Sequence, residues 1–294
     1  MSPRSSRLSR VPLLLLVLAL AAVLAFAACK DDEKKTGTTP STGQTPAAGE
    51  IDISNVPELA DGKMTIGSDI AYAPLEFYQT GTETPDGLDV DLAKAIAEAL
   101  GVDVEFINSG FDGIIEALNT DEFDAVMSAM TIDADRSKLV DFVPYLNVGE
   151  GIVVPTGNPN SIAGLDDLCG LTVAVQLGTV QEKGLKALND ETCGDNDVKI
   201  VTFDTNPLAV EDVTTGGADA NYSDFPVAFL DAQQSEGRLE VVEPAPNPQP
   251  YGIAVRKGST ELKGVLTEAL QAVKDSGKYD EVLAAWDLES TALP

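Results

Sequence analysis

The sequence predicts an α/β protein whose body is divided into two lobes. Short apolar runs of strand length alternate with helical patterns over residues 63–127, an order typical of a parallel sheet with helices on its faces. This alternation stops near residues 156–159 and starts again at residue 171. Two such units joined by two strands leave a cleft between them, and ligands of open α/β sheets bind outside the carboxyl ends of the strands.

In the first unit, strands are expected at 63–68, 102–107 and 125–127, and helices at 90–100 and 112–119. The helix over 90–100 carries Leu92, Ile96 and Leu100 at helical spacing and stops at Gly101, a favourable residue for a helix end. The strand over 102–107 alternates apolar and polar residues. Residues 69–77 contain a proline and two aromatic residues and are expected to form a loop.

In the second unit, strands are expected at 171–175, 199–203, 218–222 and 239–242, and helices from about 181, after 207 and from 225. Strands at 150–155 and 251–255 frame this unit, and the second is expected to run back beside the first. Two closing helices are predicted from apolar positions at helical spacing, which are Leu262, Val265, Leu266, Leu270, Val273, Tyr279, Val282, Leu283 and Trp286.

The N-terminal region has the pattern of an export signal. Three arginines lie within the first ten residues, and an uncharged run over 11–28 precedes Cys29. The end of this run resembles the bacterial lipobox, in which the cysteine is lipidated; an ordinary secretory signal and an uncleaved anchor helix are the alternatives. Residues 30–50 lack aromatic and large aliphatic side chains, so they are expected to form a flexible tether that spans about 25 Å.

Composition excludes several functions for the body. The formal net charge of −29 argues against nucleic-acid binding, which depends on basic patches. Histidine is absent from the sequence, which argues against His-dependent catalytic triads and most zinc chemistry, so neither a cofactor nor a metal is expected. In an exported chain, Cys169 and Cys193 are expected to form a disulfide.

The most informative stretch surrounds Arg136. The apolar run over 125–127 ends in small polar residues, and Arg136 follows Thr131 after five residues. A strand end of this kind can offer backbone N–H groups, a hydroxyl and a guanidinium to one small anion, and guanidinium binds carboxylates in a bidentate fashion. The alternative is that Arg136 only pairs with Asp133 or Asp141 on a solvated face.

Segments along the whole body resemble the amino-acid-binding proteins of ABC importers, which are extracytoplasmic solute receptors with the type II periplasmic-binding-protein fold. The matching segments are SDIAYAPLEF, GLDVDLAKAIAEALG, FDGIIEALNTDEFDAVMSAMTIDADRSKLVDF, VAVQLGTVQE, ADANYSDFPVAFL and YDEVLAAWDL. The resemblance implies two α/β lobes joined by a two-strand hinge. The expected divisions are 1–28 (lipoprotein signal peptide), 29–60 (lipidated cysteine and flexible linker), 61–153 (first lobe), 154–250 (second lobe) and 251–294 (remainder of the first lobe).

The resemblance also implies the residues that bind the ligand. Arg136 corresponds to the arginine that holds the α-carboxylate, Thr131 and Thr179 to further carboxylate donors, and Ala129 and Asp224 to the groups that receive the α-ammonium. Tyr72 and Phe111 match residues that cover the ligand's side chain, and Asp69 matches an acid near the distal cation of basic ligands. Val180 replaces a second threonine of the family.

Each assignment has a structural alternative. Thr179 and Asp224 also suit helix N-caps, and an Asp at position 69 also suits turn geometry. Tyr72 and Phe111 could be residues of the core at the cleft edge.

The expected function is capture of a free amino acid, polar or basic, by hinge closure, with delivery to an ABC permease from a monomeric body tethered to the membrane by lipid. A dehydratase of prephenate or arogenate on the same fold is the enzymatic alternative, with Asp69 and Glu116 as candidate acids. An amino-acid sensor is a third hypothesis.

Overall fold

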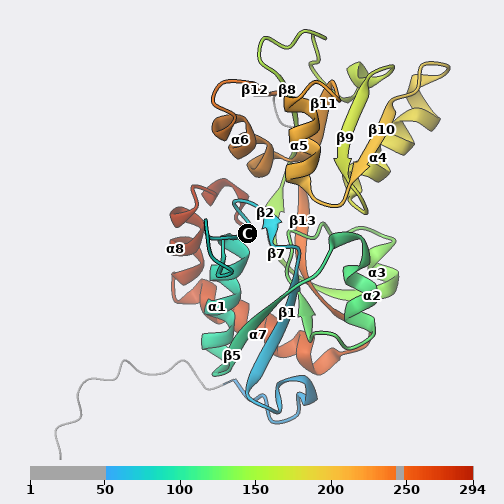
Figure 1. Cartoon of the computed structure of the whole chain (residues 1–294). Coiled ribbons are helices and arrows are strands. Elements are labelled where there is room, and N and C mark those ends of the chain that lie inside the picture. The colour runs from blue at the N-terminus through green and yellow to red at the C-terminus, as the bar shows by residue number, and fades with distance from the viewer. Residues whose placement is uncertain (1–50, 243–247, 294) are drawn as a thin grey trace, which may run out of the picture. The chain divides into compact units, whose positions relative to one another are not determined.

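The computed structural model describes residues 51–242 and 248–293, and these described residues belong to one compact unit. The expected signal peptide, Cys29 and the tether up to residue 50 lie outside the described residues. None of the described helices combines the length and the apolar character that a membrane crossing requires. The described chain forms two α/β lobes, each built on a five-stranded sheet (Figure 1).

The sheet of the first lobe has the strand order β5-β1-β6-β13-β7. Its strands are β1 (Lys63–Ser68), β5 (Asp103–Asn108), β6 (Ala125–Val126), β7 (Val140–Val148) and β13 (Gln249–Arg256). β1 pairs in parallel with β5 and β6, whereas β13 runs antiparallel to β6 and β7. The predicted parallel sheet is therefore mixed, because β13 enters it from the opposite direction.

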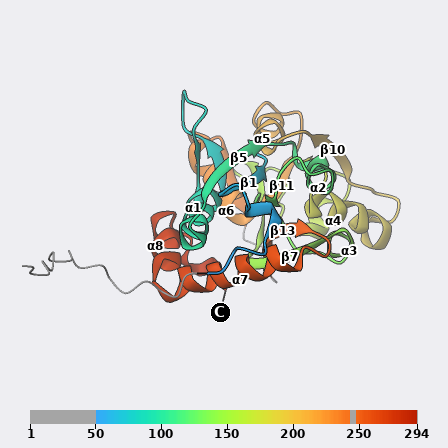
Figure 2. The same ribbon diagram turned by 90° about the horizontal axis from the view of Figure 1, so that it is seen from below.

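Helices cover both faces of this sheet. They are α1 (Leu88–Leu100), α2 (Ile114–Asn119), α3 (Arg136–Leu139), α7 (Thr260–Asp275) and α8 (Lys278–Ala285). Successive strand residues point to opposite faces, so Ala125 packs with α1, α7 and α8, while Val126 packs with α2. Figure 1 and Figure 2 both show α1 and α8 on one side of the sheet and α2 and α3 on the other.

Short elements complete the first lobe. They are the small sheet of β2 (Ala71–Tyr72), β3 (Glu76–Tyr78) and β4 (Pro85–Asp86), and the 3₁₀ turns η1 (Pro57–Leu59), η2 (Phe111–Gly113) and η5 (Glu289–Thr291). Ile51, Val56 and Leu59 are buried in the core of this lobe. Residues 51–60 are thus packed rather than part of the flexible linker to which the sequence assigned them, because these three apolar side chains cover the core.

The sheet of the second lobe has the order β10-β9-β11-β8-β12. Its strands are β8 (Glu150–Pro155), β9 (Thr172–Gln176), β10 (Lys199–Phe203), β11 (Ala220–Asp224) and β12 (Leu239–Val242). The remaining elements are α4 (Val180–Leu188), α5 (Asn206–Thr214), α6 (Phe225–Gln234), η3 (Leu165–Leu168) and the π-turn η4 (Asn189–Cys193). The predicted disulfide between Cys169 and Cys193 is confirmed.

The connection between the lobes differs from the expectation. β8 pairs with β11 and β12, and β13 pairs with β6 and β7, so the strands at 150–155 and 251–255 lie in different sheets and do not pair. The chain leaves the first sheet at Val148 and enters the second at Glu150. The whole of β8 therefore belongs to the second lobe, and the crossing lies at Gly149 rather than after residue 153.

Candidate functional site

A cleft between the lobes collects all eight residues that the sequence singled out. They are Asp69, Tyr72, Phe111, Ala129, Thr131, Arg136, Thr179 and Asp224. The carboxyl ends of β1 and β6 supply the first-lobe residues Asp69 and Ala129, and that of β11 supplies Asp224 from the second lobe. The cavity measures only about 10 Å³, which is room for about one water molecule.

Arg136 supplies the positive charge of the cleft. Its guanidinium donates from Nη1 to the carbonyl oxygen of Thr131 at 2.7 Å and from Nη2 to that of Gly178, in the other lobe, at 3.0 Å. The ring of Phe111 lies against the same group, with 5.2 Å from Cζ to the ring centroid. The side chain is therefore held in one orientation by both lobes.

The neighbouring acids do not neutralise this guanidinium. Asp133 instead accepts from the backbone N–H of Arg136 at 2.7 Å, and Asp141 pairs with Lys257 at 2.8 Å. Among the ion pairs of the described residues, none includes Arg136. Burial lowers the pKa of Arg136, and the nearby charges of Asp133 and Asp224 oppose this shift without an ion pair to the guanidinium.

Asp224 supplies a negative charge from the second lobe. It lies at the start of α6, but its side chain makes no capping hydrogen bond to the helix. Instead, Oδ2 accepts from the hydroxyl of Tyr72 across the cleft at 2.8 Å, and Oδ1 accepts from the amide of Gln181 at 2.9 Å. Burial raises the pKa of Asp224 to about 6, so the group is mostly ionised at neutral pH.

Asp69 adds a second acid from the first lobe. The amide of Gln176, at the end of β9, donates to Oδ2 of Asp69 at 2.5 Å. Asp69 is 6% exposed, and burial raises the pKa of its carboxyl group to about 6. The carboxylate therefore points into the cleft and contacts the opposite lobe, which a residue serving only turn geometry would not do.

Thr179 acts as the N-cap of α4. Its hydroxyl accepts from the N–H of Glu182 at 3.2 Å and donates to the carbonyl of Gln176 at 2.7 Å. The hydroxyl proton is thus already used, so the backbone N–H groups at this helix start are the donors left for an anion.

Ala129 lies in the turn after β6 and has φ +46°, a conformation that non-glycine residues rarely adopt.

Four further polar residues line the cleft and were not predicted as site residues: Glu76, Ser128, Gln176 and Gln181. Gln176 could have been found, because it directly follows a predicted strand at its carboxyl end. Gln181 lies in the first turn of a predicted helix. Glu76 gave no local signal, since it lay in a segment expected to be a loop and its partners are distant in sequence.

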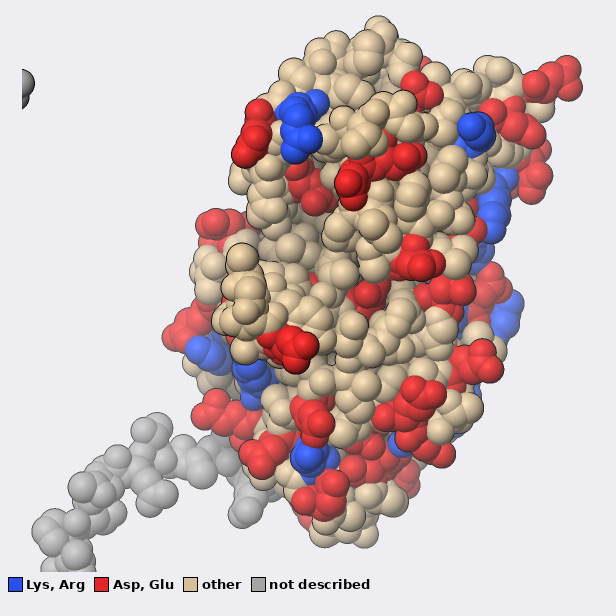
Figure 3. All heavy atoms as spheres, viewed as in Figure 1, with Lys and Arg blue, Asp and Glu red and all other residues tan. Residues whose placement is uncertain are grey.

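Charges are distributed differently on the outer surface and in the cleft. Figure 3 shows Asp and Glu scattered over both lobes, with Lys and Arg fewer. In the cleft, the guanidinium of Arg136 faces the buried carboxyl groups of Asp69 and Asp224. This arrangement complements a zwitterion that carries one additional positive charge.

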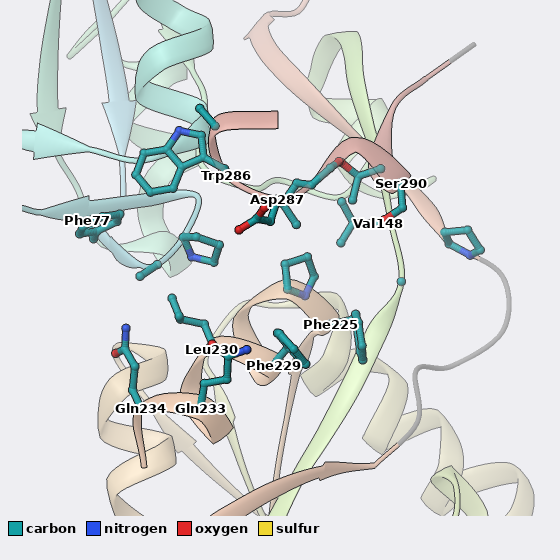
Figure 4. Close-up of a pocket in the computed structure, with 18 of the residues that line it drawn as sticks. Phe77, Val148, Phe225, Phe229, Leu230, Gln233, Gln234, Trp286, Asp287 and Ser290 are labelled. Carbon is teal, nitrogen blue, oxygen red and sulfur yellow. The ribbon is translucent and has the colours of Figure 1, made fainter. Parts of the chain in front are cut away.

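A second, larger cavity of about 850 Å³ lies beside the crossing between the lobes. Figure 4 shows Phe77 and Trp286 on one wall and Phe229 and Leu230 of α6 on the other. Among the described residues of its lining, Asp287 is the one charged residue, and none of the eight predicted residues is present. Of these two cavities, the smaller one brings together opposite charges from both lobes, so it is the candidate site for a charged ligand.

Comparison with known proteins agrees with this geometry. Residues 64–289 match the family model of bacterial extracellular solute-binding proteins, family 3. A probable histidine-binding protein of Neisseria gonorrhoeae is 32% identical over 235 residues, which cover 78% of this chain and 85% of that protein.

Two solved structures are also similar. An ancestral arginine-binding protein bound to arginine shares 39% identity with a TM-score of 0.73, covering 76% of this chain and 98% of that one. The ancestral amino-acid-binding protein AncCDT-1, a precursor of cyclohexadienyl dehydratase, shares 38% identity with a TM-score of 0.71, covering 79% of this chain and 99% of that one. The chain therefore belongs to the family 3 bacterial extracellular solute-binding proteins.

Proposed function

We propose that this protein captures a free amino acid between its lobes and delivers it to an ABC import permease. The observation that carries the proposal is the pairing of Arg136, a buried guanidinium without an ion pair among the described residues, with Asp224 on the facing lobe. Arg136 would bind the α-carboxylate and Asp224 the α-ammonium. Because the two groups come from different lobes, one amino acid engages both.

The ligand's side chain is proposed to be cationic. After Arg136 and Asp224 have paired with the α-groups, Asp69 remains in the cleft as an acid without a cationic partner. A neutral or acidic side chain would leave this carboxylate buried without a counter-charge, which is costly. Arginine, lysine or another basic amino acid would supply that charge, whereas glutamate would be rejected.

The proposed cycle requires the lobes to open. A cavity of about 10 Å³ is too small for an amino acid, and three cross-lobe contacts close it: Tyr72 with Asp224, Gln176 with Asp69, and Arg136 with the Gly178 carbonyl. When the lobes separate, these donors and acceptors become available to the ligand. A ligand that replaces the contacts binds the closed state better than the open one and so shifts the population toward closure.

Anchoring at the membrane is part of the proposal. Cys29 would carry the lipid, and the segment after it would let the body reach a permease. Fractionation of cells that express the wild type and Cys29→Ala tests this: the wild type should be found with the membrane and the variant in the released fraction. Retention of the variant in the membrane fraction would favour an uncleaved anchor helix.

An enzymatic function has less support. Glu116, one of the two acids proposed for a dehydratase, is exposed on α2 and does not line the cleft, so this assignment is wrong. Asp69 does line it, and one structural neighbour is an ancestral binding protein on the route to a dehydratase. Incubation of the purified protein with prephenate and arogenate should give no phenylpyruvate or phenylalanine; turnover would replace the binding proposal.

A thermal-shift screen against the twenty amino acids, followed by calorimetry, tests the main proposal. Arginine, lysine or histidine should raise the melting temperature most, and glutamate should have no effect. A protein that responds to none of the twenty would contradict amino-acid capture. Uptake measured in a strain that lacks the protein separates transport from sensing, because only a transport protein is needed for accumulation of the ligand.

A further inference from the structure

Two carboxyl groups meet in the first lobe at the inner wall of the cleft. Glu76 of β3 and Asp89 of α1 are 1% and 0% exposed, and their carboxyl groups interact directly. One oxygen of each, Oε2 of Glu76 and Oδ1 of Asp89, has no hydrogen-bond donor among the described residues. Two buried carboxylates in this position would repel each other, whereas a single proton between these two oxygens satisfies both.

The surrounding donors determine which group holds the proton. Oδ2 of Asp89 accepts from the hydroxyl of Tyr145 at 2.6 Å and from the N–H of Ala129 at 2.9 Å. Asp89 also lies in the first turn of α1, where the helix dipole favours an anion. Glu76 receives one donor, the hydroxyl of Ser128, at 3.0 Å on Oε1. Asp89 is therefore the ionised partner and Glu76 the protonated one.

The charges near Glu76 also favour its protonated form. Burial and the neighbouring Asp89 raise the pKa of Glu76 well above its ordinary value. Asp69, in the loop after β1, raises it further, and the other titratable groups that interact with it are the phenols of Tyr72 and Tyr145. Among the described residues, none of these groups is a cation that would favour ionised Glu76.

The carboxyl pair holds the turn that forms one wall of the cleft. Asp89 binds the N–H of Ala129, which has the unfavourable φ of +46°. The Ser128 hydroxyl accepts from the N–H of Asp69 at 2.9 Å and donates to Glu76. Asp89 thus fixes the turn after β6, and Glu76, through Ser128, fixes the backbone at Asp69.

We propose that Glu76 and Asp89 share one proton and act together as positioning residues for the binding cleft. Glu76 then presents a neutral group to the ligand, and Asp69 is the first-lobe carboxylate that recognises a cationic side chain. The effect on amino-acid affinity rests on the proposed function, whereas the shared proton does not.

Glu76→Gln is the informative variant, because its amide mimics the protonated acid: Oε1 can accept from Ser128 while Nε2 donates to Asp89. Its affinity for the amino acid selected by the thermal-shift screen should remain within about twofold of the wild type at neutral pH. Asp89→Ala removes the acceptor of the Ala129 N–H and should weaken binding at least about tenfold. Glu116→Gln, at an exposed acid, is the matched control and should have no effect.

Difference infrared spectroscopy detects the proton shared by Glu76 and Asp89 and requires no ligand. At mildly alkaline pH the wild type should show the C=O stretch of a buried carboxylic acid, and Glu76→Gln should lack it. The folded protein also holds this proton to higher pH than the unfolded chain, so its stability should fall as pH rises through the folded-state pKa of Glu76, a fall that is absent from Glu76→Gln.

The two proposals fail in different ways. A wild type that binds no amino acid but shows the infrared band contradicts amino-acid capture and retains the proton-sharing pair. A wild type without the band, or a folded Glu76→Gln variant that loses affinity tenfold or more, would overturn the pair and make Glu76 a charged contact to the ligand.

Discussion

Replacing Arg136 with alanine removes the one cationic side chain among the described residues that line the cleft. Arg136 is 9% exposed, and the carbonyl groups of Thr131 and Gly178 accept hydrogen bonds from its two terminal nitrogens. The Thr131 carbonyl belongs to the same lobe, so it still orients the guanidinium when the lobes open, and the N–H groups released from Gly178 are available to the ligand's carboxylate. In the variant, that carboxylate would be buried beside Asp69 and Asp224 without a counter-charge.

The expected loss of affinity is large. Truncating one partner of a buried, hydrogen-bonded charge pair costs about 2–5 kcal/mol, which corresponds to about 30-fold to several thousand-fold in the dissociation constant. The effect on folding should be much smaller. Two hydrogen bonds of about 1 kcal/mol each are lost, but a buried cation without an ion pair is also removed, so the free energy of unfolding should change by no more than about 2 kcal/mol.

Calorimetry with the amino acid selected by the thermal-shift screen measures the loss of affinity, and urea unfolding measures the change in the free energy of unfolding. Arg136→Lys keeps the charge but loses the bidentate geometry, so its affinity should lie between those of the wild type and Arg136→Ala. Lys138→Ala removes a cation that is 72% exposed two residues away and should bind like the wild type. An Arg136→Ala variant that folds and binds within twofold of the wild type would refute the assignment of the carboxylate site.

Three further outcomes are expected. Asp69→Asn should weaken binding of arginine or lysine about tenfold or more while changing glutamine affinity little, and equal losses for all three would contradict its role toward a cation. Burial raises the pKa of both Asp224 and Asp69 to about 6, and the ionised forms bind cations, so affinity for a basic amino acid should fall as pH decreases through that value. Titration calorimetry between neutral and acidic pH measures this, and Asp224→Asn should keep only the part of the dependence that comes from Asp69. Reduction of the disulfide between Cys169 and Cys193, which closes a loop with a sequence separation of 24, should lower the free energy of unfolding by about 3 kcal/mol. Urea unfolding with and without reductant tests the last point, and an unchanged midpoint would show that the second lobe does not depend on the bridge.

The edge strand β7 shows where sequence patterns fail. Val140–Val148 forms a nine-residue strand that was not predicted, and Pro144 lies in its middle. Proline has no backbone N–H to donate to a neighbouring strand, so a proline within an apolar run argues against predicting a strand there. In the fold, β7 is the outermost strand of its sheet and, apart from a bridge between Leu146 and Ala292, pairs with β13 alone. Proline is tolerated in such an edge strand.

By itself, the sequence determined the elements and the strand ends on which the site is built. Apolar periodicity and the breaks after it predicted the two α/β lobes, placed Asp69 and Asp224 just beyond predicted strands and placed Arg136 in the segment that follows another, because these signals are local. Only the tertiary structure decided which groups meet. Tyr72 contacts Asp224 across 152 positions of sequence, and Gln176 contacts Asp69 across 107, contacts that no local pattern encodes.

Local sequence patterns also do not predict the protonation of Glu76 and Asp89 at the wall of the cleft. In the sequence, Glu76 lies in an expected loop and Asp89 at the start of an expected helix. From sequence alone, both would be taken as ionised surface groups. Packing of β3 against the start of α1 removes both from water and leaves each with an oxygen that only a shared proton satisfies. Their charge state is therefore a property of the folded core, because desolvation and proximity, which set it, exist only after the chain has folded.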